Sequence, residues 1–196
     1  MVTSRKNTGA PKTAKPVRAD AHRNRERLLE VARRVFATDG KVTLDSIARE
    51  AGVGIGTLYR HFPTREALIE AVYRAEIRRL CDSATELART THPADAALRA
   101  WMDRFADYIA AKREMADALR VAVASGAITR EGVRAELSTA VTDLLDAGAE
   151  DGTLRPDARA QDVVAALVGI FLACGPDQRA QADRLMCLLV DGLRPR

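Results

Sequence analysis

Side chains that could bind a partner crowd one short stretch of the chain. A helix from about residue 54 to residue 61 would bury Leu58 on one side. Its other side would present Ile55, Gly56, Thr57, Tyr59, Arg60 and His61. A helix this short that exposes aromatic, hydroxyl and cationic groups together indicates that a partner binds them. Gly56, having no side chain, lets the helix backbone approach another surface closely.

A preceding helix and a glycine turn position this stretch. Thr43 is a good N-cap for the preceding helix, which presents Ile47 on an inward face. Gly52 supplies the sharp turn, because glycine adopts a positive φ without steric cost. A helix, a turn and a short second helix over about residues 43–62 form a helix-turn-helix, whose second helix enters the major groove of DNA.

The chain offers no residue set for catalysis or for a metal site. No Ser/His/Asp or Cys/His arrangement, H-E-x-x-H or Walker sequence occurs. Cys81, Cys174 and Cys187 are too widely spaced for typical zinc ligands and fit buried structural thiols. The glycine run before Thr57 is not a dinucleotide-binding loop, because Thr57 takes the place of the third glycine and no strand precedes it. We therefore expect no enzyme, no metal and no cofactor.

The rest of the sequence predicts an all-α protein of about nine helices. Apolar residues recur at helical spacing, no alternating strand pattern appears, and aromatic residues make up only 4% of the chain. No stretch approaches the ~18 consecutive apolar residues that span a bilayer. The basic N-terminus lacks the apolar segment of a secretory signal. We therefore expect a cytoplasmic protein with no membrane contact.

Charge is distributed unevenly along the chain. Residues 1–79 contain 17 Lys and Arg against 9 Asp and Glu, whereas the remainder contains 14 against 18. A basic front suits a protein whose N-terminal part meets a polyanion. Residues 1–20 are rich in Thr, Ala and Pro, without periodicity, and predict a disordered basic arm. This arm either solubilises the chain or adds affinity for phosphates.

Three consecutive segments carry a resemblance to a known family. They are ARRVFATDG, then TLDSIAREAGVGIGTLYRHF, then PTREALIEAV, within roughly residues 22–80. Together they resemble the DNA-binding domain of the tetracycline-repressor (TetR) family of bacterial regulators. The resemblance implies a DNA-binding domain at residues 21–80 and a C-terminal domain for ligand binding and dimerisation at residues 81–196. It further implies a sequence-specific repressor that leaves a palindromic operator when a small molecule binds the C-terminal domain.

The resemblance also implies roles for the matching positions. The helix from Ile55 to His61 would lie in the major groove, where Thr57 and Arg60 are the candidates for base edges. An arginine can bind guanine O6 and N7 together, which discriminates by ~1–3 kcal/mol. The implied phosphate contacts are Thr43, Tyr59, His61 and Arg65. At Arg65 the family usually has a lysine, so the charge is retained.

The last two helices are the predicted dimer interface. The stretch from Val163 to Ala173 is apolar on almost every side, which indicates burial on two sides. With the amphipathic helix after it, it would pair with the same helices of a second subunit, as the resemblance also implies. A two-fold dimer places its recognition helices ~34–36 Å apart, or a multiple of this, and requires a roughly palindromic operator.

The family generally senses a small molecule in a cavity among the long helix at residues 64–88 and the helices after it. The candidate lining residues are Trp101, Phe105, Tyr108 and Met115, with Arg78 or Arg104 as polar contacts. Aromatic residues at helical spacing also fit an ordinary core, so both interpretations stay open. In the proposed mechanism the ligand shifts the long helix and moves the recognition helices out of register with successive major grooves.

A second hypothesis is a helical sensor or interaction protein that kept the fold and lost DNA binding. The retained Thr57, Tyr59, His61 and Arg65 argue against it. Activation and repression stay open, because the sign depends on where the operator lies relative to the promoter. The effector and the operator sequence stay open as well.

Overall fold

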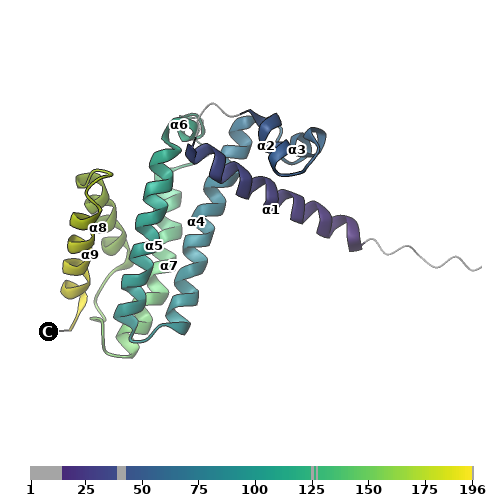
Figure 1. The fold of residues 1–196 in the computed structure, drawn as a ribbon. Coiled ribbons are helices and arrows are strands. Elements are labelled where there is room, and N and C mark those ends of the chain that lie inside the picture. The colour runs from purple at the N-terminus through teal and green to yellow at the C-terminus, as the bar shows by residue number, and fades with distance from the viewer. Residues whose placement is uncertain (1–14, 39–42, 125, 127, 196) are drawn as a thin grey trace, which may run out of the picture.

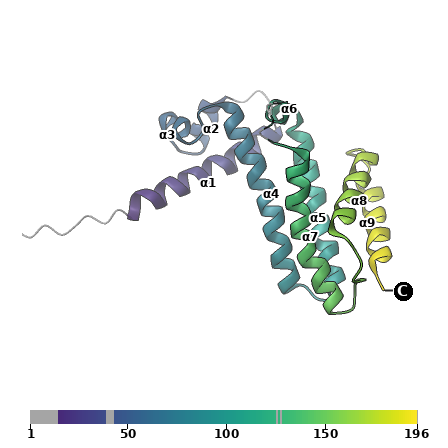
Figure 2. The ribbon, with the colours of Figure 1, turned by 180° about the vertical axis from the view of Figure 1, so that it is seen from behind.

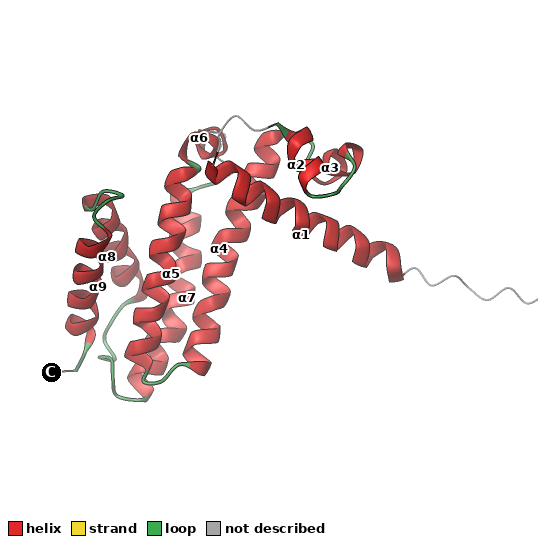
Figure 3. Cartoon of the chain, viewed as in Figure 1, coloured by secondary structure: helices red, strands yellow, loops and turns green. Residues whose placement is uncertain are grey.

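The computed structural model describes residues 15–38, 43–124, 126 and 128–195. Within these ranges the chain forms nine helices and no strand (Figure 3), which confirms the all-α fold. The helices are α1 (Lys15–Thr38), α2 (Leu44–Glu50), α3 (Ile55–His61), α4 (Arg65–Thr90), α5 (Ala94–Glu114), α6 (Ala116–Ala124), α7 (Arg130–Glu150), α8 (Ala160–Ala173) and α9 (Arg179–Leu193). None of the described helices combines the length and the apolar composition needed to cross a membrane.

The first three helices gather at one end of the molecule, around the start of α4 (Figure 1). Their shared core contains Leu28, Phe36, Ile47 and Leu58, all at most 2% exposed. Because these side chains come from α1, α2 and α3, burying them fixes the three helices relative to one another.

The helix α1 begins at Lys15, earlier than the start near residue 21 that periodicity predicts. Residues 15–20 of the expected arm are therefore helical, and residues 1–14 lie outside the described residues. The first turns of α1 project away from the other helices (Figures 1 and 2). Among the side chains of α1 whose burial is described, from residue 19 to residue 36, the first buried apolar one is Leu28. Apolar periodicity reports packing, so it could not reveal helical turns that have nothing to pack against.

The helices α4, α5 and α7 run side by side as the body of the molecule (Figure 2). With 26 residues, α4 is about 39 Å long and reaches from the first three helices to the far end of this body. The indole N–H of Trp101 in α5 donates to the backbone oxygen of Leu80 in α4, at 3.0 Å. This bond satisfies a polar group inside the apolar core.

The helices α8 and α9 form an outer layer on the side of the body away from α1 (Figure 1). Their inner faces bury Val163, Leu167 and Met186. Their outer faces leave Leu172 81% and Leu188 66% exposed. In the single chain, α8 is therefore covered on one side only, although its sequence is apolar on nearly every side.

Candidate nucleic-acid interface

Backbone hydrogen bonds fix the turn between α2 and α3. Gly52 adopts φ +64°, in the left-handed region that favours glycine. Its N–H donates to the Arg49 oxygen at 3.1 Å, and the Val53 N–H donates to the Ala48 oxygen at 2.9 Å. This pair of bonds is the Schellman motif, which satisfies the last carbonyls of α2. The direction in which α3 leaves the turn is therefore set by the backbone.

One side of α3 is buried and the other is open to water. Leu58 is fully buried, and Phe62, directly after the helix, is 2% exposed. Tyr59 is 50% and Ile55 38% exposed, an unusual pair of large side chains to leave in solvent. A side chain at Gly56 would meet nothing within 4 Å, so the fold itself does not require glycine there.

The two candidates for reading bases lie together on the exposed side. Arg60 Nη2 donates to the Thr57 hydroxyl oxygen at 3.0 Å, and Arg60 Nε donates to the Gly56 oxygen at 3.2 Å. Without a partner, the guanidinium therefore folds back along α3. To reach a base edge, Arg60 must exchange these two bonds for bonds to DNA, and Thr57 would be freed in the same step.

The candidates for phosphate contacts occupy different surroundings. Tyr59 lies on the open side of α3, and Thr43 is exposed and caps α2, its hydroxyl oxygen accepting from the Ser46 N–H at 3.3 Å. His61 is half-buried and lines a groove between α1 and α4. Arg65 lies with its guanidinium 5.0 Å from the centre of the Phe36 ring, a cation–π contact with α1.

The groove between α1 and α4 adds cations that the motif does not include. Its volume is about 480 Å³, and it borders α3 through His61 and Phe62. Arg25 of α1 lines it, with its guanidinium 5.5 Å from the centre of the Phe62 ring. Glu26, Glu70 and Asp82 also line it, so the groove is mixed in charge. The sequence shows α1 to be basic, but which cations reach α3 depends on how α1 packs.

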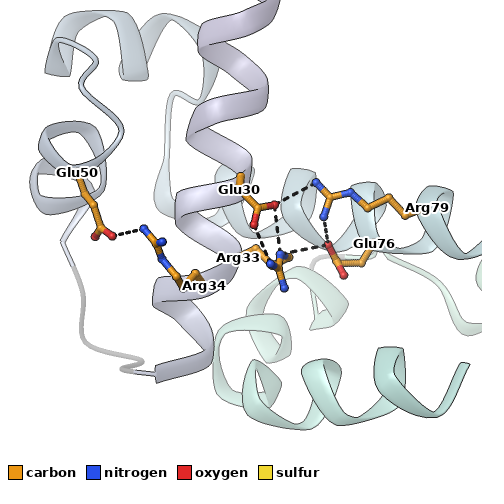
Figure 4. A network of polar contacts seen from close by, with 6 residues as sticks. All are labelled: Glu30, Arg33, Arg34, Glu50, Glu76 and Arg79. Carbon is orange, nitrogen blue, oxygen red and sulfur yellow. Dashed lines mark hydrogen bonds and ion pairs between the residues drawn. The ribbon is translucent and has the colours of Figure 1, made fainter. Parts of the chain in front are cut away.

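Ion pairs join α1 to α4 and to α2 (Figure 4). Glu30 of α1 accepts from Arg33 at 2.7 Å and from Arg79 of α4 at 3.3 Å, and Arg79 also donates to Glu76 at 2.8 Å. The bond from Arg33 is the main reason that the pKa of Glu30 is lowered. A separate pair, Arg34 with Glu50, joins α1 to α2. Ion pairs thus connect α1 to both α4 and α2, in addition to their apolar packing.

Two of the predicted ligand contacts line a cavity in the body of the molecule. Phe105 and Tyr108 face a space of about 350 Å³ bounded by α4, α5, α6, α7 and α8. The Tyr108 hydroxyl donates to the Tyr73 hydroxyl at 2.7 Å. Tyr73 and Lys112 also line this cavity and were not among the predicted contacts. Helical periodicity predicts that both residues lie on helices, but it cannot predict which helices enclose a cavity.

The other four predicted ligand contacts lie away from this cavity. Trp101 is fully buried in the core and Met115 is 3% exposed, and neither lines the cavity. Arg78 lines surface grooves beside α4. Arg104 lies on the surface of α5, 3.5 Å from a carboxylate oxygen of Glu86. Core packing thus accounts for Trp101 and Met115 in this structure.

Comparisons with known proteins match both parts of the chain. Residues 28–72 match the family model for bacterial regulatory proteins of the tetR family. Residues 92–195, more than half of the chain, match the C-terminal domain of SbtR-like transcriptional regulators. HTH-type transcriptional regulators of Staphylococcus aureus are 38% identical over 63 residues. That match covers 31% of this chain and spans only 34% of those relatives.

Solved structures extend the similarity to nearly the full chain. A TetR transcriptional regulator from Streptomyces coelicolor is 54% identical, with a TM-score of 0.75, covering 87% of this chain and 98% of that one. A TetR regulatory protein from Mycobacterium vanbaalenii is 38% identical, with a TM-score of 0.72, covering 92% and 100%. The chain therefore belongs to the TetR family of bacterial transcriptional regulators, which bind DNA through a helix-turn-helix.

Proposed function

We propose that this protein is a homodimeric repressor that reads a palindromic operator through α3 and releases it when a small molecule binds the C-terminal domain. The observation that carries the DNA-binding part is the exposed side of α3. Tyr59, Thr57 and Arg60 lie there together, opposite the fully buried Leu58. Hydroxyl and guanidinium groups are the groups that bind phosphates and base edges.

The outer faces of α8 and α9 support the homodimer. Leu172 and Leu188 are the most exposed large apolar side chains among the described residues, and Leu172 also lines the cavity between α4, α5, α6, α7 and α8. Ala165 and Gly169 are exposed on the same side of α8, and their small size lets another helix approach closely. A second copy of the same two helices would cover these residues and form a four-helix interface.

The path from cavity to DNA supports ligand-driven release. Tyr73 of α4 lines the cavity, and the first residues of α4 follow directly after α3. The pair of Glu30 with Arg79 ties α1 to the same helix. A ligand that binds one position of α4 better than another shifts the population toward it. In a dimer, such a shift changes the spacing of the two α3 helices.

The experiment that tests DNA reading selects bound fragments from random duplex DNA with the purified protein at two salt concentrations. We expect a two-fold symmetric site that is bound far more tightly than random DNA. Its affinity should fall as salt rises, because phosphate contacts release counterions. Weak, salt-sensitive binding without a consensus would overturn the proposal and favour a helical sensor protein that has lost DNA binding.

A matched pair of variants controls the selection. Arg60→Ala removes a side chain on the exposed side of α3, whereas Arg89→Ala removes an exposed one in the last turn of α4. The first variant should recover an altered or weaker consensus, and the second should recover the original site. Repression itself is tested by placing the selected site in a reporter promoter, where deleting the regulator should raise expression.

A further inference from the structure

The cavity in the body of the molecule has mostly apolar walls. Its volume of about 350 Å³ lies within the range of pockets that take small organic ligands (~300–1,000 Å³). The apolar lining comes from four helices and includes Phe105, Ile109, Leu119, Val133, Leu137 and Val168. Such walls favour a ligand whose main part is apolar.

Two tyrosines add a polar corner to this cavity. Tyr73 and Tyr108 are 4% and 6% exposed, and the Tyr108 hydroxyl uses its proton in the bond to Tyr73. Among the described residues nothing accepts the proton of the Tyr73 hydroxyl. Burial raises the pKa of Tyr108, so that side chain stays neutral. The pair therefore leaves one hydroxyl donor for an acceptor from outside the chain.

Three cations line the same cavity. Lys112, Arg130 and Arg134, all exposed to solvent, contribute to its walls, and none of the described acidic residues does. The Lys112 ammonium lies 5.6 Å from the centre of the Tyr73 ring, which places it near the polar corner. No ion pair joins any of the three to a carboxylate of a described residue. By contrast, Arg99 and Arg179 each have carboxylate partners.

Two acids of α7 lie nearby without lining the cavity. Glu131 lines a groove between α7 and α8. Glu136 lines a neighbouring pocket that shares Tyr73 and Val133 with the cavity, and its negative charge contributes to the raised pKa of Tyr108. Among the described residues, three cations therefore line the cavity and one carboxylate lies next to it.

We infer that this cavity binds an amphipathic anion, with an apolar body against the helix walls and one carboxylate-like end near Lys112, Arg130 and Arg134. The inference rests on the proposed function, since it takes this cavity as the effector site. A cationic amphiphile would meet like charges, and a neutral one would gain no charge-assisted hydrogen bond from these cations.

The test measures binding of three probes that share one alkyl chain: decanoate, decanol and decylamine. Calorimetric titration of the full-length protein should give a dissociation constant for decanoate at least tenfold below those of the other two. Lys112→Met and Arg134→Met should each weaken decanoate binding several-fold and change decanol binding little. Arg89→Met, which removes an exposed cation far along α4, should change neither.

The outcomes separate this inference from the proposed function. Equal binding of decanoate and decanol, tighter binding of decylamine, or no binding of any probe would overturn the anionic class. None of these results would affect operator selection. If decanoate binds as expected while operator affinity stays unchanged, the ligand class stands and the proposed ligand-driven release is wrong.

Discussion

At Gly56, a substitution is expected to affect folding stability and DNA binding in opposite directions. A Cβ at this position would contact nothing within 4 Å in the free protein. Gly56→Ala should therefore raise the stability of α3 by up to ~1 kcal/mol, because alanine has the higher helix propensity. If DNA approaches the backbone here, the same variant should bind the operator at least tenfold more weakly.

Urea denaturation and operator titration measure the two effects of Gly56→Ala separately. A variant that is more stable and also binds DNA normally would show that DNA does not approach α3 at this residue. Asp146→Asn, on an exposed position of α7, serves as the control for handling and purification.

Truncating Tyr59 and truncating Arg60 should change DNA binding in different ways. Tyr59→Phe deletes one hydroxyl that is expected to bind a phosphate, so affinity should fall by a similar factor on all DNA sequences. Arg60→Ala should relax the preference at one base position in each half-site, at a cost of ~1–3 kcal/mol. Binding to a set of single-base operator variants measures both patterns. A uniform loss with Arg60→Ala would contradict its role in reading bases.

Residue types on α3 were predictable from the sequence, whereas their contacts were not. The motif spacing indicated that Leu58 is buried and that Thr57, Tyr59 and Arg60 face outward, and the structure places them so. It gave no sign that Arg60 bonds to Thr57, or that Arg65 packs on a ring of α1. Those contacts depend on side-chain rotamers and on neighbouring helices.

Among the elements, the pair of α1 and α4 gives a prediction about pH. The pKa of Glu30 is lowered in the folded protein, mainly by its bond to Arg33. Its charged form therefore stabilises the fold above the unfolded pKa of about 4.5, and this contribution is lost as the pH falls through the lower folded value. Glu30→Gln should lower the free energy of unfolding at pH 7 by less than ~1 kcal/mol, because the pair is exposed.

Denaturant titrations at pH 7 and at pH 3 check this expectation, with and without added salt. The difference between the wild type and Glu30→Gln should shrink at pH 3 and at high salt. A difference that grows toward low pH would show that the Glu30 carboxylate is not stabilised by its arginine partners.

Helices were predictable from the sequence where they pack, and less so where they do not. Apolar spacing predicted the helices of the body, including α7 with its buried Leu137, Val141 and Leu144. The start of α1 at Lys15 was not predicted, since its first turns project away from the other helices (Figure 1). Periodicity detects the packed face of a helix, whereas helical backbone can continue beyond that face.

At the scale of the molecule, tertiary packing decides which residues line the cavity, and sequence patterns could not predict this. The cavity takes residues from five helices and from the segment before α7, so no local window contains it. Phe105 and Tyr108 were predicted because they are aromatic, but Trp101 shares that pattern and is a core residue. Only the packing of α4, α5 and α7 separates the two cases.

The outer layer of α8 and α9 gives the last prediction, which concerns assembly. Leu188→Arg places a charge on a side chain that is 66% exposed in the single chain and does not line the cavity, so the chain should still fold. Burying that charge between two subunits is costly, so the dimer should dissociate. Analytical ultracentrifugation measures the loss of dimer, and circular dichroism checks that helicity is retained.

Operator binding by Leu188→Arg should fall together with the loss of the dimer. Two half-sites bound by one dimer gain affinity because the second contact is intramolecular, and a monomer loses this gain. Leu188→Met keeps an apolar side chain and should leave both assembly and affinity intact. The contrary outcome is that Leu188→Arg remains dimeric at the concentrations at which the wild-type protein is dimeric. In that case the subunits meet through another surface, and the spacing of the two α3 helices must be derived from that surface.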